Sequence, residues 1–390
     1  LGLSPGCAQG SRMIVCFRRF RKCQIRQMMM TCFLLSVIKV YWESLDNDAS
    51  SHIKSYSLRL LNSLDFIRAN LTISYEEARK FSNHRYLINH EQKCVNQDVL
   101  LLLLVKSSPE NFERRQAIRS TWGNEVYIRG NLGVTVRVLF ALGVHPQPLI
   151  RRKLQQRLVR EDQIYQDLIQ QDFLDTFHNL TIKLLLQLGW KHAYCDHAHF
   201  LMSADDDIFV HMPNLMRYLQ EINQTGVKDF WVGKVHRGAP PIRKKNSKYY
   251  VSHEMYPWLL YPDYTPGAAY VISRDVASRV YRASLTLNAS LHIDDVFMGI
   301  CAHAIGVLPQ EHVFFSGEGR APNHVCIYNQ MMTSHGHVKD FHELWKLATD
   351  PAVQQVSTGL FGKLYCTVAK IRLLCALHTL NTYPCKAAFL

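Results

Sequence analysis

The sequence predicts an α/β domain built on a mostly parallel β-sheet with helices on both faces. Short apolar runs alternate with stretches of helical periodicity along the chain. In addition, three acidic residues, Asp205-Asp206-Asp207, directly follow one of the apolar runs. Ligands of such sheets bind beyond the carboxyl ends of the strands, so the triplet marks the expected functional edge. The length of 390 residues allows one large domain, or two modest ones, with appendages.

The expected elements follow in order from the spacing of apolar residues. Residues 99–105 form a continuous apolar run, which is typical of a strand buried on both faces. Pro109 stands in the first turn of the helix expected at 109–122, where proline is tolerated. Further strands are expected at residues 134–142, 199–204, 230–233 and 268–272, and further helices at 149–170 and 176–190.

The acidic triplet Asp205-Asp206-Asp207 predicts a divalent-cation site. Adjacent carboxylates beside apolar residues raise one another's pKa values and destabilise a fold unless a cation lies between them. Carboxylate oxygens suit Mn²⁺ or Mg²⁺, and such an ion suits a phosphate-bearing substrate. The alternative is a solvated acidic turn, which the apolar residues on both sides disfavour.

A second acidic pair, Asp294-Asp295, also interrupts apolar residues. One of these carboxylates could act as a general base that takes a proton from an attacking hydroxyl group. The alternative is a helix N-cap, for which aspartate is favoured and which the apolar residues from Val296 onward could follow. The two roles can coexist.

The positive charge of the chain is concentrated at its N-terminal end. The formal net charge is +13, and seven basic residues precede the first acid, Glu43: Arg12, Arg18, Arg19, Arg21, Lys22, Arg26 and Lys39. The remaining charge is mild and fits an anionic small molecule better than a nucleic acid, which would require a dense basic surface.

The apolar residues 28–42 follow this basic cluster and predict a transmembrane signal anchor. The segment is shorter than the ~20 residues that span a typical bilayer, so we expect a marginal span. A cleaved signal peptide is the alternative, but no small-residue cleavage site follows Trp42. Residues 1–27 are then a cytosolic basic tail, and the polar residues 43–93 a luminal stem.

Glycosylation sequons and cysteines support a luminal compartment. The four acceptor asparagines are Asn70, Asn179, Asn223 and Asn288. Seven cysteines lie beyond the anchor without zinc-site spacing, which favours disulfides and leaves at least one cysteine free or paired between chains: Cys94, Cys195, Cys301, Cys326, Cys366, Cys375 and Cys385.

Several motifs occur in the order found in the Golgi β-1,3-glycosyltransferases, which the chain resembles from about Val99 to Trp345. They are RQAIRSTWG at 115–123, QDF at 171–173 with NLTIK at 179–183, ADDDIFV at 204–210, KYYV at 248–251 with YPDY at 261–264, and IDDVFMG at 293–299. The resemblance implies a GT-A (Rossmann-like) glycosyltransferase domain on a type II membrane anchor in the Golgi. It places a catalytic domain at 94–345 and a cysteine-containing extension at 346–390.

The resemblance further implies an inverting transfer of N-acetylglucosamine from UDP-GlcNAc to the 3-hydroxyl of the terminal galactose of lactosylceramide. That product would start the lacto- and neolacto-series glycosphingolipids. Expected partners are the nucleotide-sugar donor, this glycolipid acceptor, the Golgi membrane and, as homo- or hetero-oligomers, other glycosyltransferases. A β-1,3-galactosyltransferase on the same scaffold, or a non-catalytic luminal lectin-like protein, is the alternative.

The resemblance also assigns roles to single residues. Asp207 is the expected direct ligand of Mn²⁺, with Mg²⁺ as a possible substitute, and Asp205 and His335 complete the metal site, with His337 as the alternative histidine. Asp295 is the expected catalytic base, with Asp294 beside it. The candidates for donor binding are Arg115, Arg119, Lys106, Asp172, Asp205 and Asp206, although the two arginines could instead pair with neighbouring acids.

The extension contains apolar residues at helical spacing, among them Leu360, Phe361, Leu364, Tyr365 and Val368. This spacing predicts a helix in the extension. The helix could rest on the luminal leaflet near a glycolipid headgroup, or it could pack as an additional core helix held by Cys366, Cys375 or Cys385.

Overall fold

A mixed eight-stranded sheet forms the centre of the protein. The computed structural model describes residues 24–42, 49–50, 52–53, 84–288, 291–317, 319–336, 338–375 and 382–390. Across the sheet, the strands run in the order β1 (Tyr86–Ile88), β4 (Leu168–Leu174), β3 (Val136–Val144), β2 (Leu101–Lys106), β5 (Phe200–Asp205), β8 (Ala269–Ser273), β7 (Trp231–Gly233) and β9 (Gln310–Glu311). Neighbouring strands are parallel from β4 to β5, and β1 and β8 run antiparallel to their neighbours. The mostly parallel sheet predicted from the sequence is confirmed.

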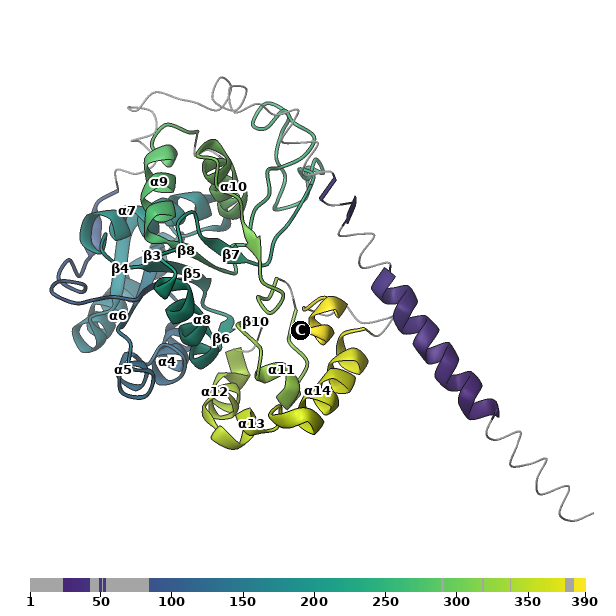
Figure 1. The fold of residues 1–390 in the computed structure, drawn as a ribbon. Helices are drawn as coiled ribbons and strands as arrows, with labels where there is room; N and C mark the ends of the chain where they lie inside the picture. Colours follow the sequence, from purple (N-terminus) through teal and green to yellow (C-terminus); the bar gives the residue numbers. More distant parts are fainter. Residues whose placement is uncertain are drawn as a thin grey trace, which may run out of the picture.

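Helices cover both faces of this sheet (Figure 1). The alternation of side chains along β2 divides the core, because Leu101 and Leu103 face one cluster and Leu102 faces the other. The first cluster is covered by α4 (Phe112–Ser120), α5 (Glu125–Leu132), α6 (Pro148–Tyr165) and α8 (Met212–Gln224). The second is covered by α7 (Leu180–Tyr194), which follows a 3₁₀ turn η1 (Phe177–Asn179), and by α9 (Arg274–Ser284) and α10 (Asp294–Ala304).

A two-stranded sheet and a group of short helices complete the fold beside the carboxyl edge of the large sheet. Strand β6 (Ile208–Val210) continues the chain beyond the acidic triplet and pairs with β10 (Thr333–His335). The C-terminal elements are α11 (Val325–Tyr328), η2 (Val338–Asp340), α12 (Phe341–Thr349), α13 (Pro351–Gln355), α14 (Gly359–Leu374) and η3 (Cys385–Phe389). Leu374, Tyr383 and Ala387 belong to the main core cluster.

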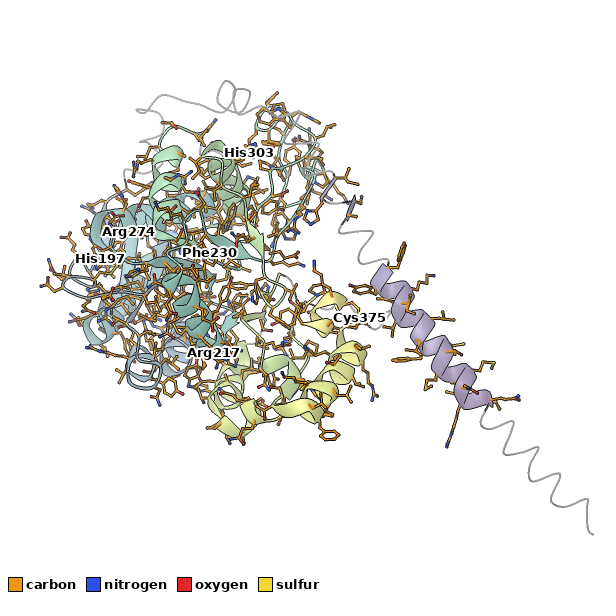
Figure 2. The ribbon with its side chains drawn as sticks, in the orientation of Figure 1. His197, Arg217, Phe230, Arg274, His303 and Cys375 are labelled. Carbon is orange, nitrogen blue, oxygen red and sulfur yellow. A yellow bond between two sulfur atoms is a disulfide. The ribbon has the colours of Figure 1, made fainter. Side chains whose placement is uncertain are left out.

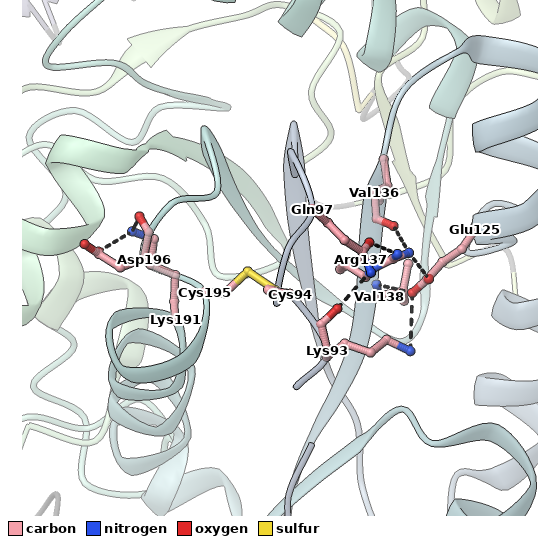
Figure 3. Close-up of a disulfide and its surroundings, with 10 residues drawn as sticks. All are labelled: Lys93, Cys94, Gln97, Glu125, Val136, Arg137, Val138, Lys191, Cys195 and Asp196. Atoms are coloured by element: carbon pink, nitrogen blue, oxygen red, sulfur yellow. Dashed lines mark hydrogen bonds and ion pairs between the residues drawn. A yellow bond between two sulfur atoms is a disulfide. The ribbon is translucent and has the colours of Figure 1, made fainter. Parts of the chain in front are cut away.

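Within the described residues, three disulfides join separate elements. Cys94 and Cys195 join the segment before β2 to the end of α7, next to the hydrogen bonds of Arg137 (Figure 3). The other two join α11 to α14 and α14 to η3 through Cys326–Cys366 and Cys375–Cys385. Cys301 is a free, buried thiol. The prediction of disulfides with at least one unpaired cysteine beyond residue 43 is therefore confirmed.

The expected helix over 149–170 is wrong in its last part, because α6 ends at Tyr165 and β4 begins at Leu168. Gln166 adopts a left-handed conformation with φ 50° and caps the helix, a position where glycine is the usual sequence signal. The sequence has no glycine here to mark the end of the helix, and the apolar residues Leu168 and Ile169 fit the helical spacing, so the predicted helix is too long. Both residues are buried in the sheet.

The sheet also begins earlier than expected. Strand β1, Tyr86–Ile88, pairs with β4 although it lies in the segment expected to be a stem. The helix expected at 109–122 is shorter at both ends, since α4 spans Phe112–Ser120.

A separate helix spans residues 24–42 and projects away from the sheet (Figure 1). Its apolar side chains are exposed along most of its length, as Figure 2 shows. Among the described residues, no helix has both the length and the apolarity needed to cross a membrane. Residues 1–23 of the expected cytosolic tail 1–27, the acceptor Asn70 and the alternative histidine His337 lie outside the described residues.

Candidate active site

The two acidic clusters meet at the carboxyl edge of the sheet, and Lys106 joins them. Lys106 is the last residue of β2 and is in register with Asp205, the last residue of β5. Its Nζ lies 3.0 Å from Asp205 Oδ1 and 2.9 Å from Asp294 Oδ2. Burial opposes the charge of this lysine, but the two carboxylates outweigh burial and raise its pKa. The ammonium group thus holds the acids of β5 and α10 together.

The three acids of the triplet have different surroundings. Asp206 is buried and accepts hydrogen bonds from Ser107 Oγ at 2.7 Å, Asn111 Nδ2 at 2.8 Å and Arg114 Nη1 at 2.7 Å. Its oxygens are therefore occupied by protein donors, and it fixes the turn after β5. Burial, together with the charge of Asp294, raises the pKa of Asp205 to about 6 although Lys106 opposes the shift.

Asp207 faces His335 because β6 and β10 pair. In that ladder His335 is opposite Ile208, the residue after Asp207, and His335 Nε2 lies 3.4 Å from Asp207 Oδ1. Asp207 Oδ1 is buried and accepts no hydrogen bond within the described part of the chain. Contact with His335 lowers the pKa of Asp207 and raises that of His335.

This arrangement fits a divalent cation in part. A buried carboxylate oxygen without a hydrogen bond and a facing imidazole are an oxygen and a nitrogen donor of the kind that Mn²⁺ accepts. Asp205, the third expected ligand, is paired with Lys106. Over the described ranges, no group of three histidine, cysteine or acidic side chains is assembled as a metal site. An ion bound here would therefore draw its remaining ligands from substrate or water.

Asp295 has the properties expected of a proton acceptor. It lies in the first turn of α10 and accepts a hydrogen bond from the backbone N–H of Gly267 at 3.3 Å. Burial, followed by the neighbouring charge of Asp294, raises its pKa to about 7. A Cβ atom on Gly267 would lie 2.9 Å from Lys106 Nζ and 3.2 Å from Asp294 Oδ2. Glycine at this position therefore leaves room for the acids and the lysine.

The N-cap alternative for Asp294 does not apply. Ile293 is the N-cap of α10, and no side chain caps the helix there. Asp294 is the first helical residue, and its carboxylate pairs with Lys106. The favourable interaction of both acids with the helix N-terminus remains.

Three residues expected at the donor site are held by contacts within the protein: Arg115, Arg119 and Asp172. Arg115 is fully buried and donates to both oxygens of Glu161, each at 2.8 Å. Arg119 pairs with Glu161 and Asp167 at 2.6 and 2.7 Å. These contacts correspond to the alternative of pairing with neighbouring acids. Asp172 accepts a hydrogen bond from the backbone of Arg85 beside β1, so it joins the first strand to β4.

The sequence reasoning overlooked Arg114 and Tyr261. Arg114 pairs with Asp206 and lies 3.9 Å from Asp207 Oδ2, but its neighbour Arg115 was selected instead. In a helix over 112–120, Arg115 lies on the same face as the apolar Ile118, whereas Arg114 points in a different direction. The hydroxyl group of Tyr261 is buried and has no hydrogen-bond partner among the described residues. Burial raises the pKa of Tyr261, and the charge of Asp295 adds to the shift.

The expected glycosylation sites differ in their surroundings. Asn223 is exposed near the end of α8. Asn179 donates its side-chain amide to the carbonyl of Leu174 at 2.8 Å, and Thr181 of the same sequon is buried. The sequon of Asn288 runs into residues that are not described.

The chain is similar to known proteins over nearly its whole length. It is 63% identical over 372 residues to lactosylceramide 1,3-N-acetyl-beta-D-glucosaminyltransferase B of Danio rerio, covering 95% of this chain and 97% of that protein. It is 59% identical over 381 residues to lactosylceramide 1,3-N-acetyl-beta-D-glucosaminyltransferase of Homo sapiens, covering 97% and 100%.

Among solved structures, a mannosyltransferase of Pyrobaculum calidifontis in complex with GDP-Man and Mn²⁺ matches 86% of this chain and 83% of that one. The identity is 9% and the TM-score 0.31. The sequence matches the galactosyltransferase family over residues 113–313, which include the acidic triplet and both acids of α10. This chain therefore belongs to the galactosyltransferase family.

Proposed function

We propose that this chain transfers N-acetylglucosamine from UDP-GlcNAc to the 3-hydroxyl of the terminal galactose of lactosylceramide, with inversion at the anomeric carbon. The observation that carries the proposal is the meeting of the two acidic clusters around Lys106 at one edge of the sheet. The names of relatives that share more than half of its residues over nearly the whole chain supply the donor sugar and the acceptor. A GT-A fold is part of the proposal, and the acidic triplet at the carboxyl end of β5 supports it.

In this reaction Asp295 is the general base. Its carboxylate accepts the proton of the acceptor 3-hydroxyl as that oxygen forms a bond to the anomeric carbon. The bond from the anomeric carbon to the β-phosphate oxygen breaks, and UDP leaves with the electron pair. The raised pKa makes Asp295 a stronger base than an ordinary carboxylate while it still ionises near neutral pH.

Lys106 and Asp294 organise the base. Lys106 forms an ion pair with Asp294. Its positive charge therefore offsets part of the effect by which the negative charge of Asp294 raises the pKa of Asp295. The backbone N–H group of Gly267 donates a hydrogen bond to the Asp295 carboxylate. These contacts fix the direction in which the base meets the acceptor hydroxyl.

Asp207 and His335 would hold the Mn²⁺ ion, with Asp205 next to them. Bound there, the cation would neutralise the diphosphate of the leaving UDP. Arg114, 3.9 Å from Asp207 Oδ2, would add positive charge on the same side. Asp206 would act through the turn that it fixes, since its own oxygens are already occupied.

The proposal includes a Golgi membrane protein of type II topology with a luminal catalytic domain. Support comes from the exposed apolar side chains of the helix at 24–42 and from the basic residues that precede it in the sequence. Glycosylation at Asn70, Asn179, Asn223 and Asn288 and assembly with other glycosyltransferases belong to the same proposal.

The test is UDP release by the full-length protein with UDP-GlcNAc and either lactosylceramide or lactose, with and without Mn²⁺. Turnover that needs the ion and falls about a hundred- to ten-thousand-fold in Asp295→Asn is expected. Asp98→Asn, an exposed acid paired with His199, is the matched control and should retain activity.

Other outcomes separate the alternatives. Preference for UDP-galactose would indicate a β-1,3-galactosyltransferase with the same base. Sugar binding without UDP release from either donor would indicate a lectin-like protein. Binding of Mn²⁺, measured by electron paramagnetic resonance, should weaken in Asp207→Asn and His335→Ala whether or not the protein turns over.

A further inference from the structure

Helix α14 presents an apolar stripe to solvent. Phe361, Leu364, Tyr365 and Val368 are exposed by 86%, 62%, 53% and 59%, and Leu360 in the first turn by 81%. The four residues are separated by steps of three and four, so they lie on one face of the helix. A surface helix normally turns such a stripe toward the core.

The opposite face of α14 is fixed to the protein. Cys366 forms the disulfide with Cys326 of α11, and Leu374 packs in the main core. Between them Lys370 is buried, and its Nζ donates to Gln330 Oε1 at 2.7 Å and to the carbonyl oxygen of Leu390 at 2.6 Å. The helix therefore buries an ammonium group and exposes its apolar stripe. Rotation of the stripe inward would break the disulfide and both hydrogen bonds of Lys370.

The charge of α14 indicates the chemistry of its partner. The helix contains no acidic residue, and its exposed Arg372 continues the stripe one turn after Val368. Lys363 is exposed near the other end. An apolar stripe with a tyrosine and flanking cations is typical of a helix that lies in the interface of a membrane.

A second exposed apolar helix lies on the same side of the molecule. The end of the helix at 24–42 contacts the C-terminal segment, where Val40 packs on the Cys375–Cys385 disulfide and the ring of Tyr41 lies 5.4 Å from that of Phe389. That disulfide joins η3 to α14. Figure 1 shows the two helices on one side of the sheet, and Figure 2 marks Cys375 between them.

We propose that the stripe of Phe361, Leu364, Tyr365 and Val368 rests on the surface of a lipid bilayer, with Arg372 and Lys363 at the headgroups. This inference rests on the proposed function, because the glycolipid acceptor stands in that bilayer. The docked helix is joined to the active site: Tyr383, in the segment after α14, donates its hydroxyl to the carbonyl of Thr333 in β10, which carries His335. Docking therefore holds the site at a fixed height above the headgroups.

The experiment uses the full-length protein reconstituted from detergent into phosphatidylcholine vesicles that contain lactosylceramide. The helix at 24–42 could itself keep any variant on the vesicles, so the amount of bound protein is not the readout. Hydrogen exchange of residues 359–374 is measured with and without vesicles, and kcat/KM is measured on lactosylceramide and on soluble lactose. The variant is Phe361→Ser, Leu364→Ser and Val368→Ser combined. The matched control is Val126→Ser with Leu149→Ser, two equally exposed residues on α5 and α6.

Vesicles are expected to slow exchange in α14. The triple variant should lose about tenfold or more in kcat/KM on lactosylceramide and stay within about twofold on lactose, while the control changes neither. Unchanged exchange in α14 on vesicles, or equal losses on both acceptors, would overturn the proposal. Slowed exchange that depends on protein concentration without vesicles would instead assign the stripe to a second copy of this chain. Failure of the wild type on both acceptors would remove the proposed function, and the exchange result would still decide the docking.

Discussion

At the residue scale, the environment of Asp295 predicts the pH dependence of catalysis. Burial and the charge of Asp294 raise its pKa to about 7, and only the ionised carboxylate can accept a proton. We expect kcat/KM to fall about tenfold per pH unit below pH 7 and to level off above it. The measurement is UDP release at constant free Mn²⁺.

The variant Asp294→Asn tests whether Asp295 controls the pH profile. Removal of the neighbouring negative charge lowers the pKa of Asp295, so the acidic limb should move to lower pH. His197→Gln, which changes an exposed histidine, should leave the limb in place. A limb at the same pH in Asp294→Asn would show that another group controls the profile.

Arg115 is predicted to stabilise the fold rather than bind the donor. Arg115→Met leaves Glu161 buried with Arg119 as its remaining partner, and loss of one member of a buried ion pair costs about 3–5 kcal/mol. Urea unfolding should show this loss, while KM for UDP-GlcNAc stays within about twofold. Arg157→Met, on the exposed side of α6, should change stability by less than about 0.5 kcal/mol. A stable Arg115→Met protein with a strongly raised donor KM would restore the donor-binding role.

Sequence reasoning identified the residues that meet at the site because each cluster breaks a local rule. Acids beside buried apolar strands stand out without any structure, and both clusters lie at the carboxyl edge. The position of Lys106 directly after an apolar run predicts that it lies at this edge. Its pairing with both clusters depends on the order of the strands in the sheet, which local sequence patterns do not predict. Arg115 and Arg119 could not be assigned from the sequence, because their shared partner Glu161 lies in α6 and Asp167, the second partner of Arg119, lies in the short segment after that helix.

At the element scale, the segment after α14 is predicted to position β10. Tyr383 is buried and donates its hydroxyl to the Thr333 carbonyl at 2.5 Å. The hydroxyl group of Thr382 lies 2.8 Å from Ser316 Oγ, which accepts from the backbone N–H of His335 at 3.2 Å. The C-terminal segment thus touches both sides of the strand that carries the expected metal ligand.

Tyr383→Phe removes one of these hydrogen bonds and keeps the ring in place. We expect a loss of about 1–3 kcal/mol in stability, because the Thr333 carbonyl remains buried without that donor. The affinity for Mn²⁺ should fall about tenfold, as it does when a group that supports a metal ligand is lost. Lactose KM should stay constant. Tyr127→Phe, in α5, is the control, and equal Mn²⁺ affinity in both variants would confine Tyr383 to a structural role.

Element boundaries show where local patterns fail. The strands β2, β5 and β8 follow the apolar runs closely because they are buried on both faces. The sequence pattern does not predict strand β1, because Tyr86–Ile88 is short and only partly buried at the sheet edge. Its strand conformation comes from pairing with β4, which is a tertiary contact and leaves no periodicity in the sequence.

At the scale of the whole molecule, the C-terminal extension is part of the main core. Helix α12 runs across residue 346, where the sequence suggested that the catalytic domain had ended. Leu374, Tyr383 and Ala387 belong to the same core cluster as residues of the large sheet, and the disulfides Cys326–Cys366 and Cys375–Cys385 bind the extension to α11 and to itself. The helix predicted there is confirmed, and it combines disulfide attachment on one face with an exposed stripe on the other.

Truncation after Thr349 is therefore predicted to abolish activity on both lactosylceramide and lactose. The deletion opens the core at Leu374 and Tyr383, removes the partner of Cys326 and takes the hydroxyl donor from β10. Loss of one such side chain costs about 2–5 kcal/mol, so several together approach the whole stability of a domain. Thermal unfolding and UDP release on each acceptor are the measurements.

The combined change Phe361→Ser, Leu364→Ser and Val368→Ser is the control for this deletion, because it alters the exposed face of α14 and leaves the buried face intact. It should keep the melting temperature and the activity on lactose, which the truncation loses. A truncated chain that melts at the wild-type temperature and still uses lactose would show that the extension is an appendage. The contrast follows from the two faces of α14: one belongs to the core, and the other is free for a membrane.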